Sequence, residues 1–211
     1  MTETLTLYTN PMSRGRIARW MMEEVGEPYE AVILDYGTTM KAPEYLAINP
    51  MGKVPALKHG NVVVTEGAAI CAYMADMFPD RGLAPPPGNQ ARGAYYRWMF
   101  FAAGPVEAAV TAKSMGTLAP ADKSAMVGYG SFEATMDALE SAIAGSPYIC
   151  GEQFTAADVY VGSQVGWGLM FGSIDKRPAF EDYVGRIMSR PAAIRAREID
   201  DALMPKRDEQ Q

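Results

Sequence analysis

Residues 49–67 contain main-chain groups that could bind an extended, acidic ligand. The sequence there is NPMGKVPALKHGNVVVTEG. In the cis form, the Val54-Pro55 bond would turn the N–H and C=O of Val54 outward, where they could pair with an extended peptide as an added strand. A helix is expected to begin after Glu66, and the unpaired N–H groups of a helix start attract a carboxylate.

Ser13 is the second candidate for chemistry, because it follows a short loop at the point where a helix is expected to begin. Serine is a good N-cap residue. A hydroxyl at a helix start can also donate a hydrogen bond to sulfur and so stabilise a thiolate. Two interpretations stay open: Ser13 activates a thiol, or it only caps the helix and the ligand faces Tyr8, Asn10 or Met12.

The motif NPMGKVPAL, followed by TEGAAI, resembles the glutathione-binding core of the glutathione S-transferase family. The usual family pattern is N-P-x-G-x-V-P-x-L and then E-S-x-A-I. Gly67 stands where the family usually has serine, whose hydroxyl and N–H both hold the γ-glutamyl carboxylate of glutathione. The N–H remains, and loss of the hydroxyl is expected to weaken binding by about 1 kcal/mol.

The resemblance implies further contacts with glutathione. Lys53 would lie beside the glycyl carboxylate, with Lys41 as a second candidate, although surface solvation explains either lysine equally well. Val54, held by Pro55, would pair with the cysteinyl part, and Glu66 would face the γ-glutamyl amine.

The resemblance also extends to the reacting thiol, because the loop of residues 10–13 is similar to the loop that carries the catalytic serine in the family's serine-type classes. A thiol of pKa about 8.5 needs about 2.7 kcal/mol of preferential thiolate stabilisation to fall by two units. Ser13 is the expected source. The pocket for the acceptor would lie between the two halves of the chain, lined by Asn10, Met12, Tyr96 and Met99.

The implied activity is conjugation of glutathione to a hydrophobic electrophile, as in detoxification, by a homodimer with glutathione as co-substrate and no metal. The alternatives are a glutathione-dependent isomerase or dehalogenase, or a non-catalytic interaction protein on the same fold. Residues 10–15 contain no cysteine, which disfavours a cysteine-dependent thiol reductase. One histidine, His59, and two distant cysteines lack the spacing of zinc ligands.

Composition agrees with an ordinary globular protein: the 211 residues are 48% hydrophobic and 21% charged, with a net charge of −6. Neither half is basic, which disfavours a nucleic-acid-binding surface. No apolar run approaches the roughly 18 residues of a membrane span, and the first residues lack the pattern of a secretory signal. The cytoplasm is the expected location, and the cysteines Cys71 and Cys150 are expected to be buried free thiols.

The first part of the chain is predicted to form an α/β thioredoxin-like unit. Strands are expected at residues 4–8 and 29–34, on either side of a helix that Gly26 ends. A short helix, a hairpin and a further helix follow, over residues 42–48, 55–64 and 68–78. The order βαβ and then ββα gives two parallel strands with a hairpin added to their sheet.

The proline-rich segment 80–89 is predicted to be a linker between domain 1–79, which binds glutathione, and an all-helical domain, 90–211, which completes the acceptor site. Helices are expected over residues 90–115, bent at Gly104-Pro105, and over 122–143, 179–189 and 192–203. A capping box from Thr155 to Asp158 predicts another helix start within 148–172. The tail after residue 204 is expected to be disordered.

Overall fold

The computed structural model describes residues 3–204, and these residues pack into two compact units. Unit 1 contains the residues up to Met74 together with those from Arg190 onward. Unit 2 contains Ala75–Ser189. The predicted disorder of the tail concerns residues outside the described part of the chain.

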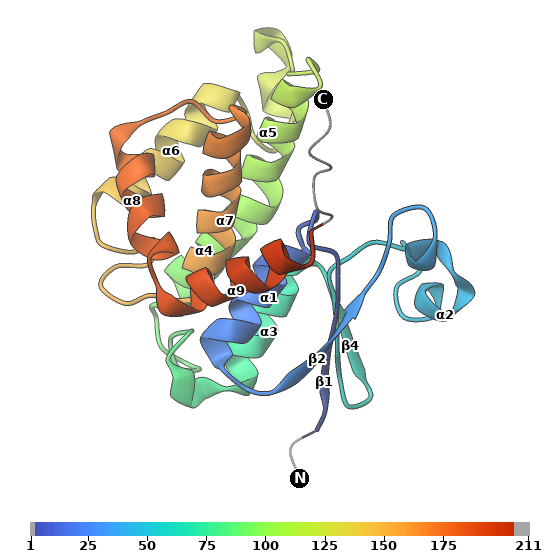
Figure 1. The fold of residues 1–211 in the computed structure, drawn as a ribbon. Helices are drawn as coiled ribbons and strands as arrows, with labels where there is room; N and C mark the ends of the chain where they lie inside the picture. The colour runs from blue at the N-terminus through green and yellow to red at the C-terminus, as the bar shows by residue number, and fades with distance from the viewer. Residues whose placement is uncertain (1–2, 205–211) are drawn as a thin grey trace. The chain divides into compact units, whose positions relative to one another are not determined.

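Unit 1 is built on a four-stranded mixed sheet (Figure 1). In sheet order the strands are β2 (Tyr29–Ile33), β1 (Leu5–Thr9), β3 (Ala56–His59) and β4 (Val62–Thr65). β1 runs parallel to β2 and antiparallel to β3, and β3 and β4 form a hairpin. The predicted thioredoxin-like topology is confirmed.

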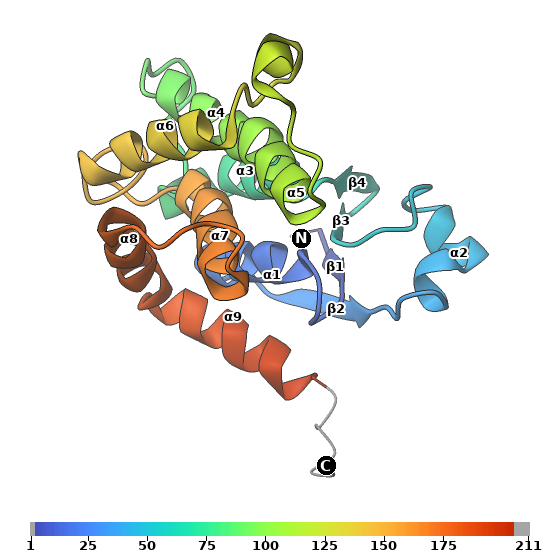
Figure 2. The same ribbon diagram turned by 90° about the horizontal axis from the view of Figure 1, so that it is seen from above.

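Helices α1 (Gly15–Val25) and α3 (Gly67–Met77) lie on the same side of this sheet in both ribbon views (Figures 1 and 2). Gly26 ends α1 with a left-handed φ of 72°, as the sequence predicts. The short helix α2 (Pro43–Leu46) follows a 3₁₀ turn and lies on the other side. The elements of unit 1 therefore follow the predicted order.

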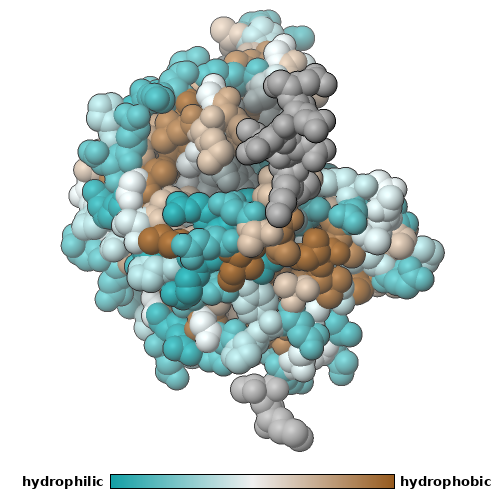
Figure 3. All heavy atoms as spheres, in the orientation of Figure 1, coloured by the Kyte–Doolittle hydropathy of each residue, from teal (hydrophilic) through white to brown (hydrophobic). Residues whose placement is uncertain are grey.

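The edge strand β2 keeps apolar side chains at the surface. Val32 is 37% exposed and Ile33 is 38% exposed. Figure 3 shows hydrophobic atoms gathered over the end of this strand, next to a hydrophilic band over α9 (Pro191–Ala202).

Helix α9 packs along α1, so unit 1 contains both ends of the described chain (Figures 1 and 2). Four ion pairs within residues 3–204 join α1 to α9 or to Arg190, the residue just before α9. They are Arg16–Asp201, Arg19–Asp200, Arg190–Glu24 and Arg195–Glu23. The division at residues 80–89 stays a prediction, and the packing adds that the last helix belongs with the sheet rather than with the other helices.

Unit 2 is helical among its described residues, apart from turns and one isolated β-bridge between Tyr148 and Gly151. Its α-helices are α4 (Arg92–Phe101), α5 (Glu107–Ser114), α6 (Phe132–Ala144), α7 (Ala156–Phe171) and α8 (Pro178–Met188). A π-helical turn, Ala102–Val106, joins α4 to α5 and contains Pro105. The predicted bend at Gly104-Pro105 is therefore a π-turn within one continuous helical run.

The expected helix over residues 122–143 is wrong in its first half. Residues Ala121–Met126 form a separate 3₁₀ turn, and α6 begins only at Phe132. Gly130, with a φ of +64°, interrupts the helical backbone conformation between them. Ser131 then caps α6, because its side chain accepts a hydrogen bond from the N–H of Ala134 at 3.1 Å.

The predicted capping box of α7 is present. Asp158 is fully buried and accepts hydrogen bonds from the N–H of Thr155 (2.9 Å), the N–H of Ile149 (2.8 Å) and the hydroxyl of Tyr183 (2.9 Å). Burial raises the pKa of Asp158 above its usual range, and these hydrogen bonds oppose the rise. Asp158 thus joins the α7 start, the preceding loop and α8, which is a structural role.

Both cysteines are free thiols. Cys71 is buried in α3, as predicted, whereas Cys150 is only half-buried. Burial raises the pKa of both thiols, that of Cys150 to about 12, with the charge of Asp158 adding to the effect. No helix in the described residues is long and apolar enough to cross a membrane.

Candidate active site

The register of the sheet brings the predicted site segments to one end of unit 1. Tyr8 pairs with Ala56, and Ala56 also pairs with Thr65. The loop after β1, the residues before β3 and the residues after β4 therefore leave the sheet at the same end of its strands. These are the segments that carry Ser13, Val54 and Glu66.

The β1–α1 loop is held in place by the amide of Asn10. Its Nδ2 donates to the C=O of Leu34 at 2.8 Å, and its Oδ1 accepts from the N–H of Met12 at 2.8 Å. Asn10 is buried, while Met12 projects from the loop and is 56% exposed. Asn10 thus fixes the loop to the end of β2, and Met12 is the loop side chain that faces solvent.

Ser13 lies two residues before the first residue of α1, so the N-cap position belongs to Arg14 and not to Ser13 as the sequence predicted. Both hydrogen-bonding functions of the Ser13 hydroxyl are engaged. Oγ donates to the C=O of Asn10 at 2.7 Å and accepts from the N–H of Gly15 at 2.9 Å. The helix begins at Gly15, so Ser13 satisfies an N–H of the helix start from just outside it. A donor to sulfur would require the hydroxyl to turn away from Asn10.

Gly15 allows this close approach between the helix start and the loop. A Cβ at Gly15 would lie 2.0 Å from Thr9 Oγ1 and 2.9 Å from Ser13 Oγ. Any larger residue would therefore displace the hydroxyl of Ser13. Sequence reasoning missed this position, because a glycine in the first turn of a helix carries no signal of its surroundings.

The turn before β3 is organised by two side chains that hold the carbonyl of Lys53. Asn49 Nδ2 donates to this oxygen at 2.8 Å, and the hydroxyl of Tyr45 donates to it at 2.6 Å. Asn49 Oδ1 also accepts from the N–H of Met51 at 3.1 Å. Burial raises the pKa of Tyr45 to about 12, so its hydroxyl keeps its proton at neutral pH. The predicted motif includes Asn49, but nothing in the sequence indicates Tyr45.

The Val54-Pro55 peptide bond is cis, which is the form that the peptide-binding hypothesis requires. Neither the N–H nor the C=O of Val54 pairs with another backbone group in residues 3–204. The side chain of Val54 packs against a small core cluster that includes Leu34, Met40 and Tyr45. Val54 is therefore anchored through its side chain, and its main-chain groups remain available.

Glu66 has a φ of 68° and is the only non-glycine residue with a positive φ in the described part of the chain. Such a conformation costs free energy and is concentrated at functional sites. The C=O of Glu66 accepts from the N–H of Ile70 at 2.9 Å, and Gly67 is the first residue of α3. The unpaired N–H groups of this helix start are thus presented directly after an exposed carboxylate.

The two candidate lysines differ in their surroundings. Lys41 Nζ donates to the C=O of Met51 at 3.0 Å and to the C=O of Gly52 at 2.9 Å, which leaves one of its three N–H groups. Lys53 is exposed, and its side chain has no hydrogen bond or ion pair within residues 3–204. Lys41 braces the turn, and Lys53 is the freer cation.

The remaining candidates for the acceptor pocket belong to unit 2, where both lie on α4. Tyr96 is half-exposed and accepts a hydrogen bond from Arg92 at 2.7 Å, whereas Met99 is buried. Their role at an acceptor pocket stays a prediction. His59 is buried in unit 1, with its Nδ1 2.9 Å from the hydroxyl of Tyr73, as expected of a structural histidine.

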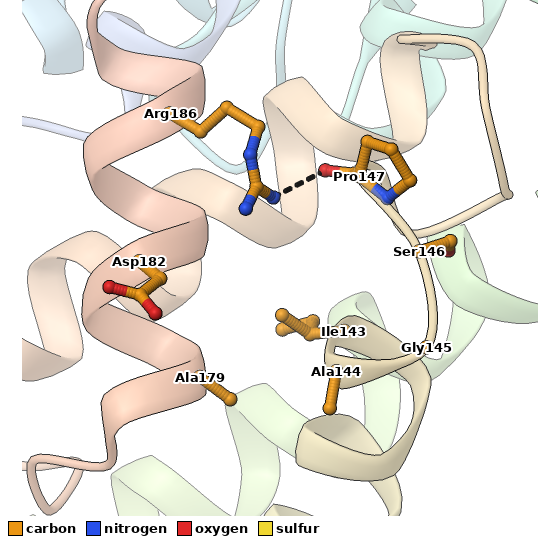
Figure 4. Close-up of a pocket in the computed structure, with 8 residues that line it drawn as sticks. All are labelled: Ile143, Ala144, Gly145, Ser146, Pro147, Ala179, Asp182 and Arg186. Carbon is orange, nitrogen blue, oxygen red and sulfur yellow. Dashed lines mark hydrogen bonds between the residues drawn. The ribbon is translucent and has the colours of Figure 1, made fainter.

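A cavity of about 510 Å³ lies elsewhere in unit 2, between the end of α6 and one face of α8 (Figure 4). Arg186 crosses one end of it and donates to the C=O of Pro147 at 2.7 Å. Asp182 lies on the same helix face. None of the predicted site residues lines this cavity.

The fold and site define a class of protein: a thioredoxin-like unit that offers main-chain groups at one end of its strands, joined to a helical unit. The family model for the N-terminal domain of glutathione S-transferases matches residues 3–76, and the model for the C-terminal domain matches residues 107–168. This chain belongs to the glutathione S-transferase family.

Individual relatives agree with this assignment. The glutathione S-transferase GstA of Escherichia coli O157:H7 is 26% identical over 166 residues, covering 77% of this chain and 82% of the relative. A sphingomonad glutathione S-transferase, solved in complex with glutathione, is 30% identical with a TM-score of 0.75, covering 93% of this chain and 98% of that chain. A glutathione transferase from Methylococcus capsulatus str. Bath is 28% identical with a TM-score of 0.78, covering 94% of this chain and 100% of that chain.

Proposed function

We propose that this protein is a glutathione transferase that joins the sulfur of glutathione to a hydrophobic electrophile. The observation that carries the proposal is that Val54, the Glu66–Gly67 helix start and the Ser13 loop share one end of the strands, set by the pairing of Ala56 with Tyr8 and Thr65. The sphingomonad relative, solved with glutathione, supports the same ligand.

Each segment has a separate role in the proposed complex. The N–H and C=O of Val54 pair with the cysteinyl residue as an added strand. The N–H groups after Glu66 hold the γ-glutamyl carboxylate, and the Glu66 carboxylate faces the γ-glutamyl amine. Lys53, with Lys41 behind it, attracts the glycyl carboxylate.

The chemistry begins when the thiol gives its proton to solvent water and Ser13 turns its hydroxyl from Asn10 to donate to the sulfur. The thiolate then forms a carbon–sulfur bond with the electrophilic carbon, and the leaving group departs with the electron pair of the bond that breaks. Hydrogen bonding to the anion lowers the pKa of the thiol and so raises the fraction of nucleophile at neutral pH.

Titration calorimetry with glutathione tests the proposal. We expect saturable heat below millimolar concentration. Cysteinylglycine, which lacks the γ-glutamyl part, should bind at least about tenfold more weakly, because it cannot reach the helix start after Glu66. Absence of heat with millimolar glutathione would refute the proposed function.

Replacing Asn49 with alanine is expected to weaken glutathione binding about tenfold and to lower the free energy of unfolding by about 1–2 kcal/mol. The change removes one donor to the C=O of Lys53 and the acceptor of the Met51 N–H. The main chain of Val54, which follows Lys53, is then held less firmly, because the hydroxyl of Tyr45 is the remaining side-chain donor to the Lys53 carbonyl. Calorimetry and urea unfolding measure the two effects.

Asn89→Ala is the matched control for Asn49→Ala. Asn89 accepts from the N–H of Ala91 at 2.9 Å in unit 2, so the control removes a similar turn bond in the other unit. It should leave the glutathione Kd unchanged. Equal Kd changes in both variants would contradict the role given to Asn49.

The acceptor, the assembly and the location are further parts of the proposal. Met12 is the exposed apolar side chain beside Ser13, which supports a hydrophobic electrophile and a role in detoxification. The homodimer is proposed from the resemblance to the family and from the aromatic side chains of α4, among which Phe100 is 72% exposed. The cytoplasm stays the expected location. A panel of electrophiles and sedimentation at micromolar concentration test the acceptor and the dimer.

A further inference from the structure

Arg16 joins the β1–α1 loop to the C-terminal helix. Its Nε donates to the C=O of Pro11, and its Nη2 lies 2.7 Å from Asp201 Oδ1. Pro11 belongs to the loop that carries Ser13, and Asp201 belongs to the last turn of α9. Both partners lie in unit 1, and both ribbon views show α9 beside α1 (Figures 1 and 2).

We propose that Arg16 is a positioning residue for Ser13 and that Asp201 holds Arg16 in the orientation this requires. The inference rests on the proposed function, because the group that Arg16 positions is the hydroxyl that would activate the thiol. Through this pair, α9 helps to position Ser13, although the two lie near opposite ends of the chain.

Charge alone does not explain an arginine at this position. A cation in the first turn of a helix opposes the helix dipole, and the first turn of α1 contains no acidic residue to balance it. The hydrogen bond to Pro11 and the ion pair with Asp201, made by one guanidinium, do explain it. Lysine has a single charged nitrogen on a flexible stem and cannot reproduce this planar geometry.

Docking of α9 does not depend on Asp201. The buried pair Arg19–Asp200 (2.7 Å) and the pair Arg190–Glu24 (2.7 Å) also join α9 and its start to α1. Among the four pairs, only Arg16–Asp201 has a partner that also contacts the loop. Loss of Asp201 should therefore loosen the loop and leave the helix in place.

The link to chemistry is the geometry of the loop. Ser13 must turn its hydroxyl from the C=O of Asn10 to the sulfur, and small displacements of a catalytic group cost large factors in rate, up to about 100-fold per ångström. The other proposed glutathione contacts belong to Lys41 and to residues 53–67. Loosening the loop should thus change the thiol pKa and kcat while the glutathione Kd stays constant.

The test compares Arg16→Lys and Asp201→Asn with Arg195→Ala. Arg195 pairs with Glu23 at 3.3 Å, so the control removes an α9–α1 ion pair that does not involve the loop. For Arg16→Lys we expect the pKa of the bound thiol to rise by about one unit and kcat at neutral pH to fall about tenfold. For Asp201→Asn we expect kcat to fall about threefold. The glutathione Kd of both variants should stay within about threefold of the wild type. In the control Arg195→Ala, the thiol pKa, kcat and Kd should not change.

Hydrogen exchange in the free protein separates this inference from the proposed function. The N–H of Gly15 is bonded to Ser13 Oγ, and the N–H of Ser13 is bonded to the C=O of Asn10 at 3.1 Å. Both amides should exchange about tenfold faster in Arg16→Lys and Asp201→Asn, but not in Arg195→Ala. Unchanged exchange and an unchanged thiol pKa in Arg16→Lys would overturn the inference even if glutathione binds. A wild-type protein that does not bind glutathione would refute the proposed function, while faster exchange would still support the hold of Arg16 on the loop.

Discussion

Replacing Ser13 with alanine is expected to raise the pKa of bound glutathione's thiol by about two units, which lowers kcat/KM at neutral pH about 100-fold. The hydroxyl lies at the start of α1 and can donate to sulfur, and the half-buried loop around it makes such a hydrogen bond stronger than it is in water. Titration of the thiolate by its ultraviolet absorbance, together with the pH dependence of kcat/KM, measures the effect.

Ser13 also accepts a hydrogen bond from the N–H of Gly15 at the helix start. The effect of losing this bond on stability must therefore be separated from the effect on the thiol pKa. Ser131→Ala supplies the control, because Ser131 is the N-cap of α6 and its hydroxyl likewise accepts from an N–H of a helix start, that of Ala134, at 3.1 Å. Each substitution should lower the free energy of unfolding by about 1 kcal/mol. Only Ser13→Ala should shift the thiol pKa. An unshifted pH profile in Ser13→Ala would leave Ser13 as a structural cap and require another residue to activate the thiol.

Local signals in the sequence predicted much of the fold and the outline of the site. Gly26 ends α1, the loop after His59 closes the hairpin, and the Thr155–Asp158 box begins α7, because each depends on residues close together in the chain. The site segments were found for the same reason: the motif around Val54 and Glu66 is contiguous.

Features that depend on residues far apart could not be predicted in this way. The donors to the Lys53 carbonyl include Tyr45, which lies on a different element, and the ion pairs of α9 join residues more than 160 positions apart. The helix expected over residues 122–143 failed for a different reason. The apolar period that predicted it runs from Phe132 to Ile143 and starts only after Gly130, where a positive φ and the capping side chain of Ser131 begin the helix.

Replacing Asp200 with asparagine is expected to lower the free energy of unfolding by about 3–5 kcal/mol. Arg19 and Asp200 are each 1% exposed, and Arg19 Nε lies 2.7 Å from Asp200 Oδ1. Asparagine keeps an oxygen that can accept from Arg19 Nε but carries no charge, so the buried guanidinium loses its counter-ion and has the hydroxyl of Tyr29, at 3.1 Å, as its other polar partner in residues 3–204. Urea unfolding measures the loss, and hydrogen exchange should place it in α1 and α9.

The double variant Arg19→Met with Asp200→Leu shows whether the charged pair itself stabilises unit 1 or whether the cost arises only when one partner is removed and the other stays buried. Arg19 Nη2 and Asp200 Oδ2 have no hydrogen-bond partner in the described residues, so neither group recovers its full cost of desolvation. We therefore expect the double variant to unfold within about 1 kcal/mol of the wild type or to be more stable. Asp201→Asn, on the exposed neighbouring pair, should cost less than about 1 kcal/mol. A double variant as unstable as Asp200→Asn would show instead that the charged pair stabilises the packing of α9 on α1, because two apolar side chains could not replace it.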